Sequence, residues 1–182
     1  MRDGARAQIV EFLPRLRRFA LALTRDRDQG DDLVQETCVR ALANIEQWQE
    51  GTRLDSWMYR IAQNIWFDRM RMKKSRGEPL DIDDMHDLAG ADGRLVVESR
   101  MTMREVAKGI AKLHPEQQVL VALVCVDGLS YKDAAEITGT PIGTVMSRLS
   151  RARSALHEAI HGEPQSGSQP AGKTTDDHRS KR

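Results

Sequence analysis

The pattern of hydrophobic and polar positions along this 182-residue chain is that of amphipathic helices. Apolar residues recur at three- and four-residue intervals, and the sequence has no sustained apolar/polar alternation and no Asn-Gly or Asp-Gly hairpin turn between β-branched runs. The pattern therefore predicts an all-α protein. The expected helices span about 6–23, 31–44, 54–75, 97–112, 115–126, 131–138 and 141–160.

The first three helices each carry a stripe of apolar residues that we expect to be buried. The first stripe consists of Ile9, Phe12, Leu13, Leu16, Phe19, Ala20 and Leu23. The second consists of Leu33, Val34, Cys38, Ala41 and Leu42. The third consists of Trp57, Ile61, Ile65 and Met72.

Two segments lack such a stripe and divide the chain. Residues 78–95 contain five Asp, one Glu, one Pro and two Gly, and residues 162–182 contain no Val, Ile, Leu, Met or aromatic residue. Neither segment has enough apolar surface to fold alone. We therefore predict two small helical domains, 1–77 and 97–161, joined by a flexible acidic linker over 78–96 and followed by a disordered tail over 162–182.

The net charge of +1 argues at first against a partner that carries many phosphates. The charges are segregated, however: residues 57–77 hold six basic residues and one acidic residue, whereas residues 78–92 hold six acidic residues and no basic ones. Local basic surfaces therefore remain available for nucleic acid.

The most specific local pattern lies in residues 130–153, which predict a helix-turn-helix. Ser130 and Asp133 are typical of a capping box, and Gly139, Thr140 and Pro141 are typical of the end of one helix and the start of the next. In the second helix, one face is expected to pack inward and another to remain free for DNA. The inward face holds Val145, Leu149, Ala152 and Leu156. The free face holds Thr144, Ser147, Arg148 and Arg151. An ordinary αα-hairpin with a solvated basic face is the alternative.

A second pattern combines aromatic and basic residues. Five of the eight aromatic residues lie within residues 48–67, directly before a basic run. They are Trp48, Trp57, Tyr59, Trp66 and Phe67. Rings beside cations can stack on single-stranded bases, with Arg60, Asn64, Arg69, Arg71 and Lys73 as the polar members, but an aromatic cluster also forms cores. Considered alone, this cluster favours the core interpretation.

A third pattern is the run Asp32, Gln35 and Glu36, which shares one face of the second helix. By itself it is typical of a solvated helix start. Taken together and in this order, the three patterns resemble the extracytoplasmic-function (ECF) class of bacterial RNA polymerase sigma factors over about residues 8–160. The strings that carry the resemblance are DDLVQETCVRAL (31–42), LDSWMYRIAQNIWFDRMR (54–71) and DGLSYKDAAEITGTPIGTVMSRLSRAR (127–153).

The resemblance implies a subunit with a sigma region 2 domain and a sigma region 4 domain, without chemistry of its own. Asp32, Gln35 and Glu36 would bind the coiled coil of the polymerase β′ subunit, and the second domain would meet the β flap. The −10 promoter element would be bound by Trp57, Arg60, Asn64, Arg69, Arg71 and Lys73. The −35 element would be bound by Thr144, Ser147, Arg148 and Arg151. An anti-sigma factor is a further expected partner, and the expected location is the bacterial cytoplasm.

Two positions depart from the family pattern. Met58 follows Trp57 where primary sigma factors carry a second aromatic residue, so a wedge of two rings is not available. Met146 stands where many relatives carry Arg, which leaves the base preference at the −35 element open. A free-standing, dimeric helix-turn-helix regulator that binds a palindrome is the alternative function.

Other chemistry has little support in the sequence. Catalytic motifs such as a P-loop, GxSxG or HExxH are absent, and we expect no cofactor, metal or small-molecule substrate. Cys38 and Cys125 fall in apolar patterns and are expected to be reduced core residues. His157 and His161 are one helical turn apart, but no third metal ligand is apparent. No apolar run approaches the length that crosses a bilayer, so we expect no membrane insertion.

Overall fold

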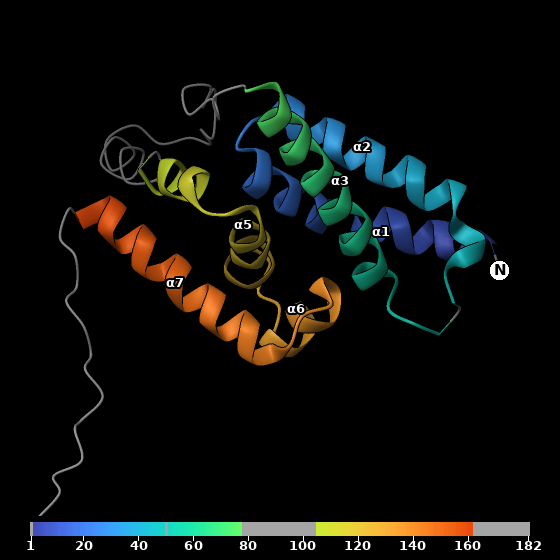
Figure 1. Cartoon of the computed structure of the whole chain (residues 1–182). Coiled ribbons are helices and arrows are strands. Elements are labelled where there is room, and N and C mark those ends of the chain that lie inside the picture. Colours follow the sequence, from blue (N-terminus) through green and yellow to red (C-terminus); the bar gives the residue numbers. More distant parts are fainter. Residues whose placement is uncertain (1, 50, 78–104, 162–182) are drawn as a thin grey trace, which may run out of the picture.

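The computed structural model describes residues 2–49, 51–77 and 105–161, and every regular element in these ranges is helical (Figure 1). This confirms the all-α prediction. The expected linker over 78–96, the expected tail over 162–182 and the first part of the helix expected over 97–112 lie outside the described residues.

The first group of helices comprises α1 (Arg2–Thr24), α2 (Arg27–Ala43) and α3 (Leu54–Arg76), with the short 3₁₀ helix η1 (Ile45–Gln47) between the last two. All three long helices contact one another. In Figure 1 they lie together, with α5 and α6 beside them.

The second group begins with a helix over residues 105–112 and continues with α5 (Pro115–Val121). The π-helix η2 (Ala122–Val126) extends α5 directly, and α6 (Tyr131–Thr138) and α7 (Ile142–His161) follow. In η2 the Asp127 backbone N–H donates to the Ala122 carbonyl at 3.1 Å, five residues back. Contacts of α7 with α5 and α6 hold this group together.

Buried side chains of the two groups form one continuous core. Helix α1 contacts η2, and α3 contacts α5 and α6. Fully buried Tyr59 is central to this core, because its ring meets those of Phe12 and Phe19 edge-on at centroid distances of 4.9 and 5.0 Å. The two groups are therefore associated through apolar contact in this structure.

Helix α2 starts four residues earlier than expected. The side chain of Asp26 accepts a hydrogen bond from the Gln29 backbone N–H at 2.7 Å and so caps the helix. Arg25 turns the chain sharply between α1 and α2 with a left-handed φ of 58°. The cap is therefore Asp26, and Asp31, where the helix was expected to begin, already lies inside it.

The predicted apolar stripes are largely correct in α1 and partly wrong in α2 and α3. Leu42 and Met72, both expected to be buried, are exposed. The buried face of α3 centres on Met58, Ala62 and Ile65, so Met72 falls at its edge. Leu42 lies one residue, or about 100° of helix rotation, beyond buried Ala41.

The helix-turn-helix forms almost as predicted, with α6 over the expected residues. The Ser130 hydroxyl accepts from the Asp133 backbone N–H at 3.1 Å, and Gly139 ends the helix with a φ of 64°. Thr140 does not cap α7 as expected, because its hydroxyl pairs with that of Thr138 at 2.8 Å. Pro141 precedes α7, and its carbonyl accepts the first helical hydrogen bonds.

Replacing Gly139 with alanine should destabilise the turn between α6 and α7. A side chain in the left-handed region costs about 1–2 kcal/mol, partly offset by the lower entropy of the unfolded chain, so we expect a loss of about 1 kcal/mol in the free energy of unfolding. Urea denaturation measures this change. Gly143→Ala is the matched control, because Gly143 is helical with open space around it, and should be neutral or stabilising. Equal losses in both variants would contradict the argument.

The cysteines are both free, but they differ in exposure. Cys38 is half-buried beside the core, whereas Cys125 is exposed, so the expectation of a core residue is wrong for Cys125. Within the described ranges, no helix is long and apolar enough to cross a membrane, and no group of three or more His, Cys, Asp or Glu side chains is arranged to hold a metal.

Candidate polymerase and nucleic-acid interface

The outward face of α2 combines acidic, polar and apolar side chains. Asp32 and Gln35 are exposed. Val39 and Leu42 continue the same face at helical spacing, and Val39 is 66% exposed. An exposed apolar pair beside acidic groups is typical of a surface that a protein partner covers. The spacing 32, 35, 39, 42 is present in the sequence, but the apolar periodicity predicts that Leu42 is buried and does not single out Val39.

Glu36 lies at the edge of this face and has two cationic partners. Its carboxylate oxygens accept from Arg40 at 2.6 Å and from Arg69 of α3 at 2.8 Å. Burial raises the pKa of Glu36, but the hydrogen bonds and charges of Arg69 and Arg40 outweigh that effect, so the pKa lies below its ordinary value. Glu36 therefore fastens α2 to α3, whereas the side chains of Asp32 and Gln35 are exposed.

The Glu36 ion pairs give a pH-dependent contribution to stability. Because the folded-state pKa is depressed, the contribution is full above the unfolded-state pKa and is lost as pH falls through the folded-state value. We expect Arg69→Gln to raise the pKa of Glu36, measured by NMR titration of its carboxyl carbon. Arg71→Gln is the control, since Arg71 pairs with Asp68 and should leave Glu36 unchanged. An unaltered Glu36 titration in Arg69→Gln would contradict this assignment.

The residues expected to bind the −10 element all lie on α3 but do not share one face. Trp57, Arg60, Asn64 and Arg71 follow one another at helical spacing along one side. Arg69 is turned towards α2 by its contact with Glu36, and Lys73 lies on that same general side of α3. The structure therefore brings four of the six together.

The aromatic cluster is mainly core, as its composition alone favoured. Tyr59 and Trp66 are buried, and Trp48, Trp57 and Phe67 are partly buried against the core. A stacking platform of several exposed rings is therefore not present on α3. Met58 is completely buried, so this position, where a second aromatic residue would stand, does not reach the surface.

Arg60 is engaged by the second group of helices. Its guanidinium donates to the backbone carbonyls of Glu136 at 2.7 Å and Ile137 at 3.3 Å, at the C-terminal end of α6. The Gln63 side chain donates to the same Ile137 carbonyl at 3.5 Å. Helix ends leave carbonyls without helical partners and carry partial negative charge, so a cation is favourable there.

A carboxylate between η2 and α6 receives donors from both α1 and α3. The Asp127 side chain is completely buried, and it accepts from Arg15 at 2.9 and 3.1 Å and from Arg18 at 2.9 Å. The Tyr59 hydroxyl donates to it as well. Arg53 pairs with Asp133 at the start of α6. We call Asp127 with Arg15, Arg18 and Tyr59 the interdomain cluster.

The second helix of the helix-turn-helix buries the predicted inward face. Val145, Leu149 and Ala152 are buried, and Leu156 is partly buried against the core. Ser147 and Arg151 are exposed on the opposite side, where the Arg151 side chain donates to the Ser147 carbonyl at 3.3 Å.

Thr144 and Arg148 lie on the flank of α7 that faces α5. Both are partly buried, and Arg148 pairs with Glu116 at 2.5 Å. Two of the four residues expected to bind the −35 element, Ser147 and Arg151, are thus exposed, and Arg148 is held by a carboxylate. The sequence spacing placed all four on one face, but the packing of α5 divides that face.

A helix-turn-helix unit packed against a three-helix unit is typical of a DNA-binding protein, and the exposed acidic and apolar face of α2 is typical of a surface that a protein partner covers. Comparison with known proteins identifies the class. Residues 9–63 match the family model of the Sigma2 domain of PhyR, and residues 103–156 match that of Sigma-70, region 4.

Full-length relatives agree with these family matches. The chain is 36% identical to the ECF RNA polymerase sigma factor EcfG of Rhodopseudomonas palustris (strain TIE-1) over 159 residues, which cover 87% of this chain and 86% of EcfG. It is 30% identical to the ECF RNA polymerase sigma factor SigW of Bacillus subtilis (strain 168) over 142 residues, which cover 72% and 75% of the two chains.

A solved structure has a similar fold. The sigma factor RpoE of Bartonella quintana, in complex with the anti-sigma factor NepR, superimposes with a TM-score of 0.66 at 31% identity. The alignment covers 88% of this chain and 98% of the other. The chain belongs to the ECF RNA polymerase sigma factors. It is an alternative sigma factor, which binds core RNA polymerase and directs promoter recognition, DNA melting and transcription initiation.

Proposed function

We propose that this sigma factor binds core RNA polymerase through the outward face of α2. The observation that carries this proposal is the continuous row of Asp32, Gln35, Val39 and Leu42, all exposed although the helix is packed on its other side. Apolar groups supply burial and the polar groups supply orientation in such interfaces. Glu36 supports the surface from its edge by holding α2 on α3. The partner surface would be the coiled coil of β′, and the second domain would meet the β flap.

We propose further that residues 1–77 bind the −10 element through α3 and that residues 97–161 bind the −35 element through α7. Trp57, Arg60, Asn64 and Arg71 form the α3 surface, with Arg69 and Lys73 near the DNA backbone. On α7 the exposed Ser147 and Arg151 support direct contact, and Thr144 and Arg148 require release from the α5 flank. Phosphate contacts position such a protein, and base contacts give it specificity.

These roles require the two domains to separate from the arrangement described here. Arg60 cannot bind promoter DNA while its guanidinium occupies the carbonyls at the end of α6. A closed form that keeps Arg60 engaged would also have little affinity for random DNA in the absence of polymerase. The nearly neutral net charge is consistent with such weak nonspecific binding.

The regulatory partner we propose is an anti-sigma factor of the NepR kind. The support is the 31% identity to the Bartonella quintana sigma factor that is bound to NepR, across nearly all of that chain. Co-purification of the tagged protein from its native cell tests this proposal, and an anti-sigma protein should be recovered with it. Recovery of polymerase alone under all growth conditions would contradict it. The cell compartment of polymerase, the cytoplasm, is the expected place of action.

Run-off transcription on genomic fragments tests the proposed promoter function. Core polymerase with this protein should start at promoters with −35 and −10 elements that core alone ignores, and Arg151→Ala should reduce that initiation. Ser154→Ala is a control on the same side of α7, beyond the proposed contacts. Tight binding to a palindrome without polymerase, with no specific initiation, would instead favour the free-standing regulator.

A further inference from the structure

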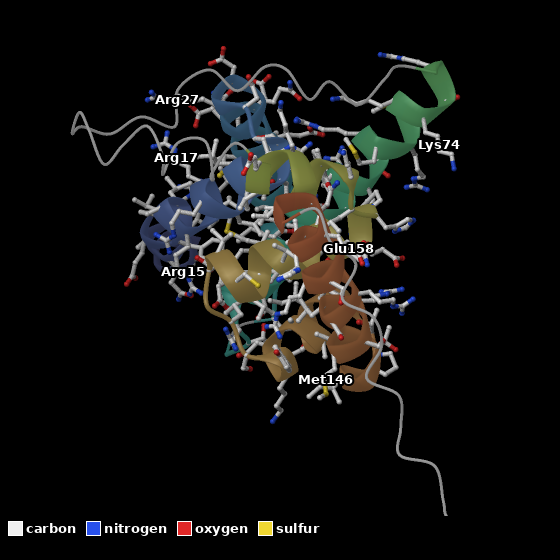
Figure 2. The ribbon with its side chains drawn as sticks, turned by 90° about the vertical axis from the view of Figure 1, so that its left-hand side faces the viewer. Arg15, Arg17, Arg27, Lys74, Met146 and Glu158 are labelled. Atoms are coloured by element: carbon white, nitrogen blue, oxygen red, sulfur yellow. The ribbon has the colours of Figure 1, made fainter. Side chains whose placement is uncertain are left out.

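The N-terminal half of α7 presents two large apolar side chains to solvent. Ile142 is 49% exposed and Met146 is 53% exposed. They are four residues apart, so they lie one above the other on the helix. Figure 2 shows Met146 at the lower end of α7, at the outer edge of the molecule. Neither side chain contributes to the core.

The helix that carries this pair is basic and polar. Residues 142–157 contain Arg148, Arg151 and Arg153 and no acidic residue. On the same side as the pair, Arg153 hydrogen-bonds to the Tyr131 hydroxyl at 3.1 Å. A small apolar area on a helix that also carries cations matches duplex DNA, whose phosphates flank a groove that also offers apolar groups.

A protein partner fits this patch less well. Stable protein interfaces bury about 1,200–2,000 Å² in total, which two side chains cannot supply. In a helix-turn-helix, the N-terminal residues of the recognition helix enter the major groove and contact base edges. The patch lies in that N-terminal part of α7. Because the patch lies on the second helix of the helix-turn-helix, DNA is the partner that fits it.

Thymine is the base that offers an apolar group in the major groove, through its C5 methyl. We infer that Ile142 and Met146 recognise thymine methyl groups of the −35 element, which makes them specificity-determining residues. This inference rests on the proposed function of α7. Arg148, held by Glu116 on the other flank, does not compete for the same base edges in this arrangement.

The test replaces thymine with deoxyuridine, which differs only by the methyl group. Holoenzyme with the full chain is assayed on a promoter found by run-off transcription, and each thymine of its −35 element is replaced in turn on either strand. For at least one thymine, wild-type holoenzyme should bind and initiate about fourfold less well, the effect of one buried methyl group. In Met146→Ala or Ile142→Ala, thymine and deoxyuridine at that position should be equivalent.

Two further variants sharpen the result. Val10→Ala removes similar apolar surface from α1 and should keep the full thymine preference of the wild type. Met146→Lys should retain binding through phosphate attraction but lose the preference. Circular dichroism checks folding, although the exposure of both α7 side chains makes large structural loss unexpected.

Several outcomes would overturn the inference. These are a −35 element made only of G·C pairs, an unchanged response to deoxyuridine at every position, and an equal thymine preference in the α7 variants. A Met146→Ala variant that keeps the preference but loses anti-sigma binding would assign the patch to that partner instead. If the wild-type protein supports no specific initiation at all, the proposed function fails. Initiation without methyl dependence overturns this inference alone.

Discussion

Replacing Asp127 with asparagine should lower the free energy of unfolding by about 2–3 kcal/mol and loosen the association of the two domains. The buried carboxylate accepts from Arg15, Arg18 and Tyr59, and a neutral amide cannot satisfy them all. Complete burial of an ion pair would give a larger loss. Here the two arginine side chains are 36% and 53% exposed, so water can solvate them after the change.

Urea denaturation and small-angle X-ray scattering measure the two effects of Asp127→Asn. We expect a lower denaturation midpoint and a larger radius of gyration. Asp31→Asn is the matched control, because Asp31 forms an exposed 3.5 Å pair with Arg17 between α1 and α2 and should change stability by less than about 0.5 kcal/mol. Asp127→Asn with wild-type stability and compactness would mean that the interdomain cluster does not hold the domains together.

Asp127→Asn should also speed holoenzyme assembly if domain separation limits it. Separation frees Arg60 from the end of α6 and leaves the outward face of α2 unchanged. Stopped-flow mixing with core polymerase measures the association rate. A slower rate in the variant would contradict the idea that the closed arrangement must open first.

Replacing Val39 with aspartate should weaken holoenzyme formation by at least about thirtyfold, the effect of a central interface residue. Val39 is 66% exposed at the middle of the proposed polymerase-binding face, so the change introduces a charge that the partner must desolvate. The fold itself should be unaffected, since Val39 takes no part in the core.

Binding of labelled protein to core polymerase measures the effect of Val39→Asp. Val10→Asp is the control: Val10 is 65% exposed on α1, outside the proposed face, and should change affinity less than twofold. Equal effects of the two variants would exclude a specific role for the α2 face. Unfolding curves that match the wild type would show that the loss comes from the interface.

Local structure was predictable where a few neighbouring residues determine it. The limits of α6 follow from the cap at Ser130 and the left-handed Gly139, both of which were recognisable in the sequence. The start of α2 cannot be chosen from the sequence, because Asp26, Asp31 and Asp32 are all plausible caps and only the turn at Arg25 selects the first.

Burial was less predictable because it depends on where partner helices lie. An apolar residue such as Leu42 or Met72 is buried only if another helix covers its side of the helix, and none in the described residues does. Periodicity shows that a helix has an apolar stripe. An error of one residue in placing that stripe, however, turns the predicted buried face by about 100° around the helix. For this reason the sequence pattern does not reveal the exposed apolar residues Val39 and Leu42, which complete the proposed polymerase-binding face of α2.

The contacts between domains could not be predicted from sequence. Asp127 looked like the end of a helix beside Gly128, which it is, and nothing nearby indicated partners 112 and 68 residues away. The residues proposed to bind DNA were recognised by type and spacing, but their present partners, such as α6 for Arg60 and Glu116 for Arg148, arise from tertiary packing.

The π-helix η2 gives the interdomain cluster an unusual dependence on chain length. A π-helix accommodates one residue more than an α-helix with the same ends, and these five-residue hydrogen bonds finish at Asp127. If the same residues formed ordinary α-helical bonds instead, the chain that follows them would be displaced by one residue and rotated by about 100°. Asp127 would then point away from Arg15 and Tyr59, although every one of these side chains would still be present. Closure of the two domains is thus controlled by a single-residue insertion in the backbone as much as by the charges it aligns.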